Sequence, residues 1–510
     1  MPSATSSAQP RPRPAVAVVG AGIAGLCTAL ELSARGCRVT LLERAACPGG
    51  KLRQSGAECA PIDAGPTVFT MREVFEQVFR AAGSSMDEHL RLQPLSVLAR
   101  HAWSAGETLD LHADRACSAA AIRDFAGAAE AAGYLRFCAD ARRVFETLDH
   151  AFLRAARPSI GGLIAHAGLR GLPDLLRLRA FRSLWDVLGG YFRDPRLRQL
   201  FARYATYCGS SPFDAPATLM LVAHVEQSGV WQIEGGMHSL ARALHALLLA
   251  RGVTVRCGAE VQRVQLQSGR VVALELVSNE RLPVDAAVLT CDAAAVGAGL
   301  FGAEAARAVP AVSAAQRSLS ALTWTGCVPT CGFELLRHNV FFSEDYAAEF
   351  DCLLSARRLP PRPTVYLCAQ DRETLRAPAP GQPERLLCLV NAPATGDCHE
   401  FNAEEVAQCL TQTRSTLQRC GLRLLSPAEN LAPTTPADFN RLYPGSGGAL
   451  YGQATHGWRA SFRRPAARTR ITGLYLAGGS THPGPGLPMA ALSGRQAARC
   501  LLQDQGLMPH

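Results

Sequence analysis

The segment from residue 15 to residue 32 constrains the fold of this chain more than any other. Residues 15–19 are a continuous apolar run, typical of a strand buried on both faces, and a glycine-rich turn follows at once. Gly20 permits the tight bend, Gly22 lets the backbone approach a pyrophosphate, and Gly25 lets the next helix pack on the strand. The glycines and Glu31 argue against a membrane span. Because the helix presents free N–H groups to phosphates, we predict dinucleotide contacts at Gly20, Ala21, Gly22, Ile23, Ala24 and Gly25.

A second apolar run, residues 38–42, ends in Glu43, eighteen residues after Gly25. In a doubly wound parallel sheet, an acidic side chain at this place binds the hydroxyls of the adenosine ribose. The alternative is a solvated strand end. We therefore predict an α/β fold with a Rossmann-type domain, in which Glu43 and the adjoining Arg44 contact the dinucleotide.

The composition fits a globular chain of two or three regions: it has 510 residues, of which 48% are hydrophobic and 19% charged. The net charge is +9, yet no dense basic run with interleaved aromatic residues suggests nucleic acid as a partner. Most of the 18 cysteines are expected to be buried apolar residues, with a zinc site at Cys327 and Cys331 as a weak alternative, so we predict no metal site. Residues 1–14 lack the apolar core of a signal peptide and are expected to form a loose tail.

The residues that follow Glu43 distinguish between dinucleotides. Residues 47–51 read Cys-Pro-Gly-Gly-Lys and resemble the second glycine signature of the flavin amine oxidase and phytoene desaturase superfamily, whose cofactor is flavin adenine dinucleotide (FAD). The basic position of that signature is commonly arginine, and here it is the single lysine of the chain. The resemblance implies FAD contacts at Gly49, Gly50, Lys51 and Leu52.

Residues 63–67 resemble the segment that returns beside the isoalloxazine ring in the same superfamily, which implies contacts from Gly65, Pro66 and Thr67. The alternative is an ordinary turn.

The carboxyl-terminal end of the chain carries a second motif. Residues 474–477 predict a buried strand, Gly478 and Gly479 follow, and Pro488 fits the first position of a helix that continues through residues 490–502. The stretch resembles the carboxyl-terminal FAD motif of carotenoid desaturases, which implies contacts from Gly478, Gly479, Gly486 and Met489. The positive end of the helix dipole would stabilise the negative charge of reduced flavin.

A third piece of the nucleotide domain is expected between these two. Residues 252–255, 260–264 and 269–274 alternate as strands do, and the apolar run 286–290 precedes Cys291 and Asp292. In related flavoproteins the residue matching Val261 touches the adenine, and Asp292 is expected at the cofactor too. The predicted organisation is a tail at 1–14, FAD-binding parts at 15–70, 223–301 and 466–510, a helical insertion at 71–222 and a mixed-sheet substrate region at 302–465.

The insertion at 71–222 shows helical spacing and no strong strand alternation, and the clue to the substrate lies at its end and just beyond it. Residues 203–216 and 229–237 resemble carotenoid desaturases, most closely the hydroxyneurosporene desaturases of purple bacteria. The resemblance implies FAD-dependent 3,4-desaturation of a 1-hydroxylated acyclic carotenoid. Alternatives are a phytoene or neurosporene desaturase, an isomerase, an amine oxidase with an aromatic cage, and a lipid-binding escort protein of the same fold without flavin.

Desaturation of a polyene transfers a hydride to flavin N5 and leaves a cation delocalised along the conjugated chain, so no strong base is required. The side chains that we consider for the substrate hydroxyl or the departing proton, each also compatible with a structural role, are Tyr204, Thr206, Tyr207, His224 and Glu226. Because the substrate resides in lipid, we expect peripheral attachment to the cytoplasmic side of a bacterial inner, photosynthetic membrane. Oxygen or a quinone would accept the electrons.

Overall fold

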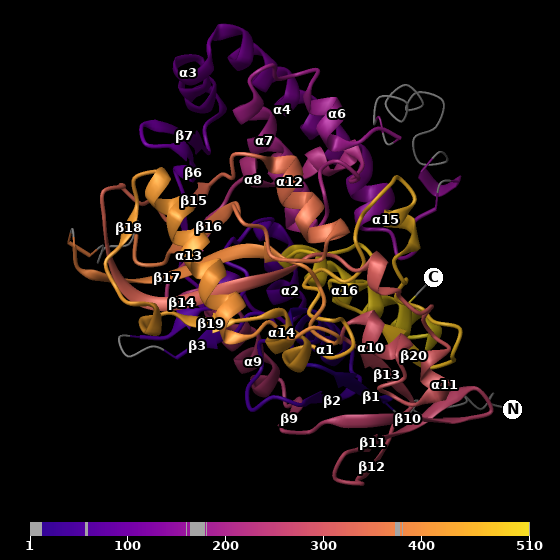
Figure 1. Ribbon diagram of the computed structural model, residues 1–510. Coiled ribbons are helices and arrows are strands. Elements are labelled where there is room, and N and C mark those ends of the chain that lie inside the picture. Colours follow the sequence, from indigo (N-terminus) through magenta and orange to yellow (C-terminus); the bar gives the residue numbers. More distant parts are fainter. Residues whose placement is uncertain are drawn as a thin grey trace, which may run out of the picture.

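The computed structural model describes residues 13–56, 60–159, 161–163, 179, 181–372, 378–379 and 381–508. A five-stranded parallel sheet lies at the base of Figure 1. Its strand order is β20 (Leu474–Leu476), β13 (Ala286–Leu289), β1 (Ala15–Val19), β2 (Arg38–Glu43) and β9 (Thr254–Cys257). These strands come from all three segments predicted for the nucleotide-binding domain. The predicted Rossmann-type sheet is therefore confirmed, including the return of the chain's carboxyl-terminal end to its edge.

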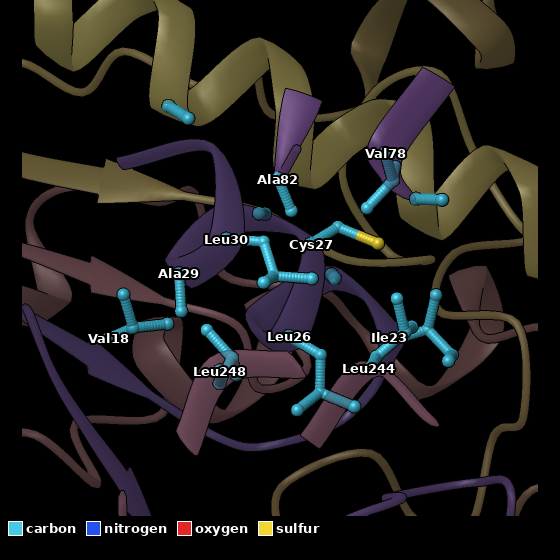
Figure 2. Close-up of a cluster of buried hydrophobic side chains, with 14 of the residues drawn as sticks. Val18, Ile23, Leu26, Cys27, Ala29, Leu30, Val78, Ala82, Leu244 and Leu248 are labelled. Carbon is cyan, nitrogen blue, oxygen red and sulfur yellow. The ribbon is translucent and has the colours of Figure 1, made fainter. Parts of the chain in front are cut away.

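Helix α1 (Ile23–Ala34) is the buried centre of this part of the molecule. It packs against α2 (Arg72–Ala81), α9 (His238–Ala250) and α16 (Leu487–Asp504). Figure 2 shows its apolar side chains between Val18 of β1, Val78 of α2 and two leucines of α9. Residues 15–32 are thus a strand, a turn and a helix, as predicted.

Helix α16 approaches α1 closely because Gly494 has no side chain. A Cβ atom at Gly494 would lie 2.3 Å from the carbonyl oxygen of Ala24. The helix begins at Leu487, so Pro488 occupies its second position and not the first, a small correction to the prediction.

An antiparallel three-stranded sheet stands beside the parallel one. It consists of β10 (Val261–Gln267), β11 (Arg270–Leu276) and β12 (Arg281–Pro283), as the alternation of residues 260–274 predicted. Two short helices, α10 (Ala293–Gly297) and α11 (Ala303–Ala306), follow β13 and help to bury the inner face of this sheet.

An eight-stranded sheet forms the middle layer of Figure 1. Its members in spatial order are β18 (Arg423–Leu424), β14 (Ser320–Cys331), β17 (Pro383–Ala392), β16 (Val365–Ala369), β15 (His338–Phe341), β6 (Val97–Ser104) and β7 (Glu107–His112), with β19 (Ala432–Thr434) paired to β14. Two small ladders join β3 (Gln54–Ser55) to β4 (Ile62–Asp63) and β5 (Leu92–Pro94) to β8 (Trp231–Ile233).

Residues 71–222, predicted as a mainly helical insertion, contain three strands between Leu92 and His112. The hairpin of β6 and β7 completes the eight-stranded sheet by parallel pairing of β6 with β15. Its apolar positions, such as Leu109 and Leu111, alternate over too few residues to stand out in an alanine- and leucine-rich segment, and pairing with a distant strand stabilises it.

The other described residues of that segment are mainly in helices, and α3, α4, α6 and α7 gather at the top of Figure 1. The helices from this part of the chain are η1 (Met86–Glu88), α3 (Arg115–Ala126), α4 (Ala128–Leu148), η2 (Asp149–Leu153), α6 (Leu184–Leu188), α7 (Pro195–Ala202), η3 (Arg203–Cys208), η4 (Ala217–Met220) and α8 (Leu221–Gln227). Those after residue 310 are η5 (Ala314–Gln316), α12 (Tyr346–Phe350), η6 (Asp351–Ser355), α13 (Ala403–Arg419), η7 (Ala428–Asn430), α14 (Pro436–Leu442) and α15 (Ala460–Arg463).

Two further features bear on the predictions. In the described residues, no helix combines the length and hydropathy needed to cross a membrane. Cys327 is disulfide-bonded, which removes it as a thiolate ligand for the zinc alternative, and the described residues contain no group of three or more potential metal ligands.

Candidate active site

One cavity of about 1630 Å³ runs through the molecule, and the predicted cofactor residues lie along its wall. Ala21 and Gly25 stand behind that wall, and the remaining predicted residues line the cavity. These are Gly20, Gly22, Ile23, Ala24, Glu43, Arg44, Gly49, Gly50, Lys51, Leu52, Gly65, Pro66, Thr67, Val261, Asp292, Gly478, Gly479, Gly486 and Met489. Segments separated by more than four hundred residues therefore share one site.

The turn after β1 has the geometry that its glycines predict. Gly20 has a φ of +102°, and a Cβ atom at Gly25 would lie 1.9 Å from the carbonyl oxygen of Gly20. Gly22 faces open space, since the nearest neighbour of an added Cβ atom would be the Cα atom of Gly50 at 3.8 Å. Helix α1 begins there without a side-chain cap, so its first N–H groups are available to an anion.

Glu43 is buried at the end of β2 and is not the solvated strand end considered as the alternative. Its side chain is 7% exposed. One carboxylate oxygen accepts the N–H of Ala21 at 2.7 Å, and the other accepts the N–H of Ala45 at 2.8 Å. The carboxylate thus fixes the glycine turn and also faces the cavity, where its remaining lone pairs can accept hydroxyl groups.

Lys51 brings a positive charge to the middle of the cavity. Its ammonium group donates to the carbonyl oxygen of Leu450 and lies 5.3 Å from the ring centroid of Tyr443. Burial lowers the pKa of Lys51, and the nearby carboxylate of Asp292 acts in the opposite direction. An anionic ligand in the cavity would stabilise the charged form of this lysine further.

Arg464 is a second buried cation, and the sequence motifs gave no sign of it. Its guanidinium donates to the carbonyl oxygen of Gln453 at 2.7 Å and that of Tyr451 at 3.2 Å, and it lies 3.4 Å from the carbonyl oxygen of Gly479. Burial lowers the pKa of Arg464. Through these bonds the side chain connects the loop before α15 to the carboxyl-terminal glycine motif.

The segment 63–67 is tightly held against the loop that carries Lys51. A Cβ atom at Gly65 would lie 1.8 Å from the carbonyl oxygen of Lys51, so only glycine fits this contact. Asp63 does not line the cavity, because its carboxylate accepts the N–H groups of Met237 and His238 at the start of α9.

Thr67 connects this segment to the eight-stranded sheet. Its hydroxyl lies 2.6 Å from the hydroxyl of Tyr366 on β16, which lies 2.7 Å from Nδ1 of His338 on β15. Burial, together with the charges of Arg337 and Arg203, lowers the pKa of His338 to about 3, so the ring is neutral. Tyr366 also lines the cavity and was not predicted.

A cluster of polar side chains from η3 and α8 lies on the same cavity. The hydroxyls of Tyr204 and Tyr207 donate to the two carboxylate oxygens of Glu226 at 2.7 and 2.8 Å. Burial raises the pKa of Glu226, although both hydrogen bonds act against this shift. Thr206 lines the cavity and donates to the carbonyl oxygen of Arg203.

His224 does not belong to this cluster. Its ring packs against Phe145 at 5.0 Å between centroids, and Ser228 donates to its backbone carbonyl. It does not line the cavity, so the structure argues against His224 as a partner of the substrate.

Beyond the polar cluster the cavity wall is apolar. Side chains from the helical segment, from the loop before α15 and from α15 itself form this part of the wall: Leu148, Phe152, Leu153, Leu163, Phe181, Leu219, Leu221, Val222, Val225, Trp458 and Phe462. Such a wall recognises a ligand by burial of apolar surface.

Comparison with known proteins identifies the family. Residues 23–502 match the model of the flavin containing amine oxidoreductases. The chain belongs to this family. It is an FAD-dependent oxidoreductase, and the open helix terminus, the glycine turn and the buried Glu43 fit a dinucleotide cofactor.

The relatives of this flavin-dependent oxidoreductase include enzymes of carotenoid metabolism, which confirms the resemblance found in the sequence. The chain is 53% identical over 488 residues to a hydroxyneurosporene desaturase of Rubrivivax gelatinosus, covering 96% of this chain and 93% of the relative. It is 43% identical over 491 residues to the hydroxyneurosporene desaturase of Cereibacter sphaeroides, covering 96% and 98%. A solved putrescine oxidase variant has a TM-score of 0.61 at 13% identity, covering 96% of this chain and 99% of that one, and shows the shared fold.

Proposed function

We propose that this protein is a carotenoid desaturase that introduces a 3,4 double bond into 1-hydroxylated acyclic carotenoids such as 1-hydroxyneurosporene. The observation that carries the proposal is the continuity of the cavity, in which the predicted cofactor residues and the apolar wall belong to one space. The names of the relatives support the same substrate class. An amine oxidase would need polar or aromatic groups around a small amine, whereas seven of the eleven residues of the apolar wall beyond the polar cluster are leucine or valine.

The residues of the cavity suggest which group contributes to each part of the reaction. FAD, when bound, would supply the acceptor for the hydride, which carries both electrons of the oxidation. The apolar wall holds the polyene by surface burial and excludes water from the reacting carbons. Glu226, whose pKa is raised by burial, lies at the polar end of that wall and can take up the departing proton. Because the developing charge is delocalised along the polyene, no stronger base is required.

Anaerobic mixing of the FAD-loaded protein with 1-hydroxyneurosporene tests the proposal. We expect bleaching of the oxidised flavin together with a red shift of the polyene absorption, because one additional double bond joins the conjugated system. Product analysis should show a 3,4-desaturated product. Neurosporene without the hydroxyl is the matched control, and we expect it to react more slowly.

The alternatives predict other outcomes in the same experiment. An isomerase would change the polyene and leave the flavin oxidised at the end. A phytoene or neurosporene desaturase would prefer the substrate without the hydroxyl. A purified protein that takes up no FAD would point to the escort protein, and any of these results would contradict the proposed function.

We further propose that the protein attaches peripherally to the cytoplasmic face of a bacterial inner membrane, from which the substrate enters the cavity and where oxygen or a quinone receives the electrons. Phe181 lines the cavity yet is 79% exposed, and its ring contacts Trp458 at 5.1 Å between centroids. The exposed Arg182 and Arg459 adjoin these two rings in the sequence. Aromatic rings flanked by arginine suit an anionic lipid surface.

Sedimentation with phosphatidylglycerol vesicles tests this attachment. The double variant Phe181→Ser with Trp458→Ser should bind about ten-fold more weakly or worse, since two aromatic side chains no longer insert into lipid. Leu249→Ser on α9, where the leucine is 53% exposed but does not line the cavity, is the control and should bind as the wild type does. Equal sedimentation of all three proteins, or of none, would contradict the proposal.

A further inference from the structure

The polar cluster on the cavity contains a cation that the predictions did not include. Arg203, the first residue of η3, lines the cavity next to Tyr207. Within the described residues its guanidinium makes one hydrogen bond, from Nη1 to the hydroxyl of Tyr207 at 3.0 Å, and no carboxylate forms an ion pair with it. An arginine has five N–H donors, so four of them have no acceptor among the described residues.

Two aromatic rings fix the direction in which this guanidinium points. Its central carbon lies 5.1 Å from the ring centroid of Tyr207 and 5.4 Å from that of Tyr366. Cation–π contacts of this kind hold the planar group in place without using its N–H donors. The side chain is therefore oriented in advance of any ligand, with donors left for one.

A permanently charged guanidinium without an ion-pair partner is costly to enclose. Tyr207 offsets part of this cost, because it accepts from Arg203 and donates to Glu226, which connects the two charges through one phenol. Glu226 also compensates the field that Arg203 would exert on a developing positive charge in the substrate. An apolar side chain would fill the site at lower cost, so the arginine points to a ligand with an acceptor atom.

The hydroxyl groups of Tyr207, Thr206 and Tyr366, which lie beside Arg203 on the cavity wall, are already engaged. Tyr207 donates to Glu226, Thr206 donates to the carbonyl oxygen of Arg203, and the hydroxyl of Tyr366 lies between Thr67 and His338. Each hydroxyl has one proton to donate. Arg203 is thus the side chain of this cluster with donors to spare.

We propose that Arg203 donates a hydrogen bond to the 1-hydroxyl oxygen of the carotenoid and so selects hydroxylated substrates, with Tyr207 as its positioning residue. The inference rests on the proposed function. Only one carbon separates the carbon that bears the hydroxyl from the 3,4 bond, so the group that reads the hydroxyl has to lie beside the reacting carbons. Tyr366 connects Arg203 to that place. Its ring contacts the guanidinium of Arg203, and its hydroxyl contacts Thr67, which belongs to the segment predicted to flank the isoalloxazine ring.

The variant Arg203→Met, assayed with 1-hydroxyneurosporene and neurosporene in competition, tests the proposal. We expect the preference for the hydroxylated substrate, measured as the ratio of the two kcat/KM values, to fall roughly 10- to 150-fold, the effect of losing a hydrogen bond from a charged donor. Arg203→Lys keeps a donor and a charge but loses the planar fork, and should retain part of the preference.

Arg198→Met is the matched control. Arg198 also stacks on an aromatic ring, that of Trp185, and donates to a backbone carbonyl, yet it does not line the cavity. This variant should keep the wild-type preference. The FAD content and melting temperature of all variants show whether each protein is folded.

Three outcomes would overturn the assignment of Arg203. One is a wild-type preference in Arg203→Met, and another is an equal loss for both substrates, which indicates a structural role. If the wild type desaturates neither carotenoid, the proposed function is wrong. The role of Arg203 in recognising the hydroxyl is then tested separately by equilibrium binding of the two carotenoids, measured by quenching of tryptophan fluorescence. The third outcome belongs to that binding assay: the Arg203→Met protein still discriminates between the two carotenoids as strongly as the wild type does.

Discussion

Gly25→Ala should weaken FAD binding by at least about 1000-fold, a loss of roughly 4 kcal/mol. The new Cβ atom would lie 1.9 Å from the carbonyl oxygen of Gly20 and 3.1 Å from Oγ1 of Thr290. Neither neighbour can yield easily, because the N–H of Gly20 donates to Leu42 and the Thr290 hydroxyl is hydrogen-bonded to the backbone of the same turn. The turn has to open, and its N–H groups then leave the positions that a pyrophosphate requires.

Titration of apoprotein with FAD, followed by flavin fluorescence, gives the dissociation constant for this comparison. Gly56→Ala is the control, since a Cβ atom there meets nothing within 4 Å and the backbone is not in the left-handed region. The circular dichroism and melting temperature of the apoprotein separate weak binding from unfolding. A folded Gly25→Ala protein with wild-type affinity would show that the turn does not bind the cofactor.

Glu43→Ala should weaken FAD binding by more than about 100-fold. The substitution leaves the buried N–H of Ala21 and the more exposed N–H of Ala45 without their acceptor, and it removes the group proposed to bind the ribose. A buried donor left unpaired, here that of Ala21, costs about 1 to 3 kcal/mol, and the loss of the ribose contact adds to this cost. Glu43→Gln should also bind FAD weakly. The glutamine amide has only one oxygen, so its NH2 group would face the N–H of either Ala21 or Ala45, and two donors cannot form a hydrogen bond.

The same titration measures both Glu43 variants, and Glu280→Ala serves as their control. Glu280 is a carboxylate in an exposed ion pair with Arg256 and lies outside the cavity wall, so its removal should leave the affinity for FAD unchanged. Affinity for FMN, which lacks the adenosine ribose, gives a further check. A loss confined to protein stability, with equal FAD binding by folded Glu43→Ala, would contradict the ribose role.

Contacts between distant segments explain the features of the protein that the sequence did not predict. The hairpin of β6 and β7 was missed because its partner, β15, lies more than two hundred residues away, and pairing decides the structure of such a short alternating stretch. Tyr366 and Arg464 belong to no local motif, and the segment that begins at Arg203 resembles carotenoid desaturases without showing what this arginine contacts. Each of the three gains its meaning from segments that only the folded chain brings together.

His224 and Glu226 show that the sequence alone does not tell which polar residue of a single helix reaches the cavity. The sequence offers both as polar residues in one segment, and nothing local distinguishes them. Residues two apart on a helix of 3.6 residues per turn point in nearly opposite directions. Glu226 therefore faces the tyrosines and the cavity, while His224 packs against Phe145.

The sequence by itself determined the nucleotide-binding architecture and the cofactor. A phosphate cradle is built from consecutive backbone groups, so glycine spacing after a strand and an acid at the end of the next strand are sufficient to predict it. Only the tertiary structure decided which polar side chains reach the cavity wall, because that depends on how distant helices and strands are rotated against one another. The substrate end of the site, with Arg203 between Tyr207 and Tyr366, is of this second kind.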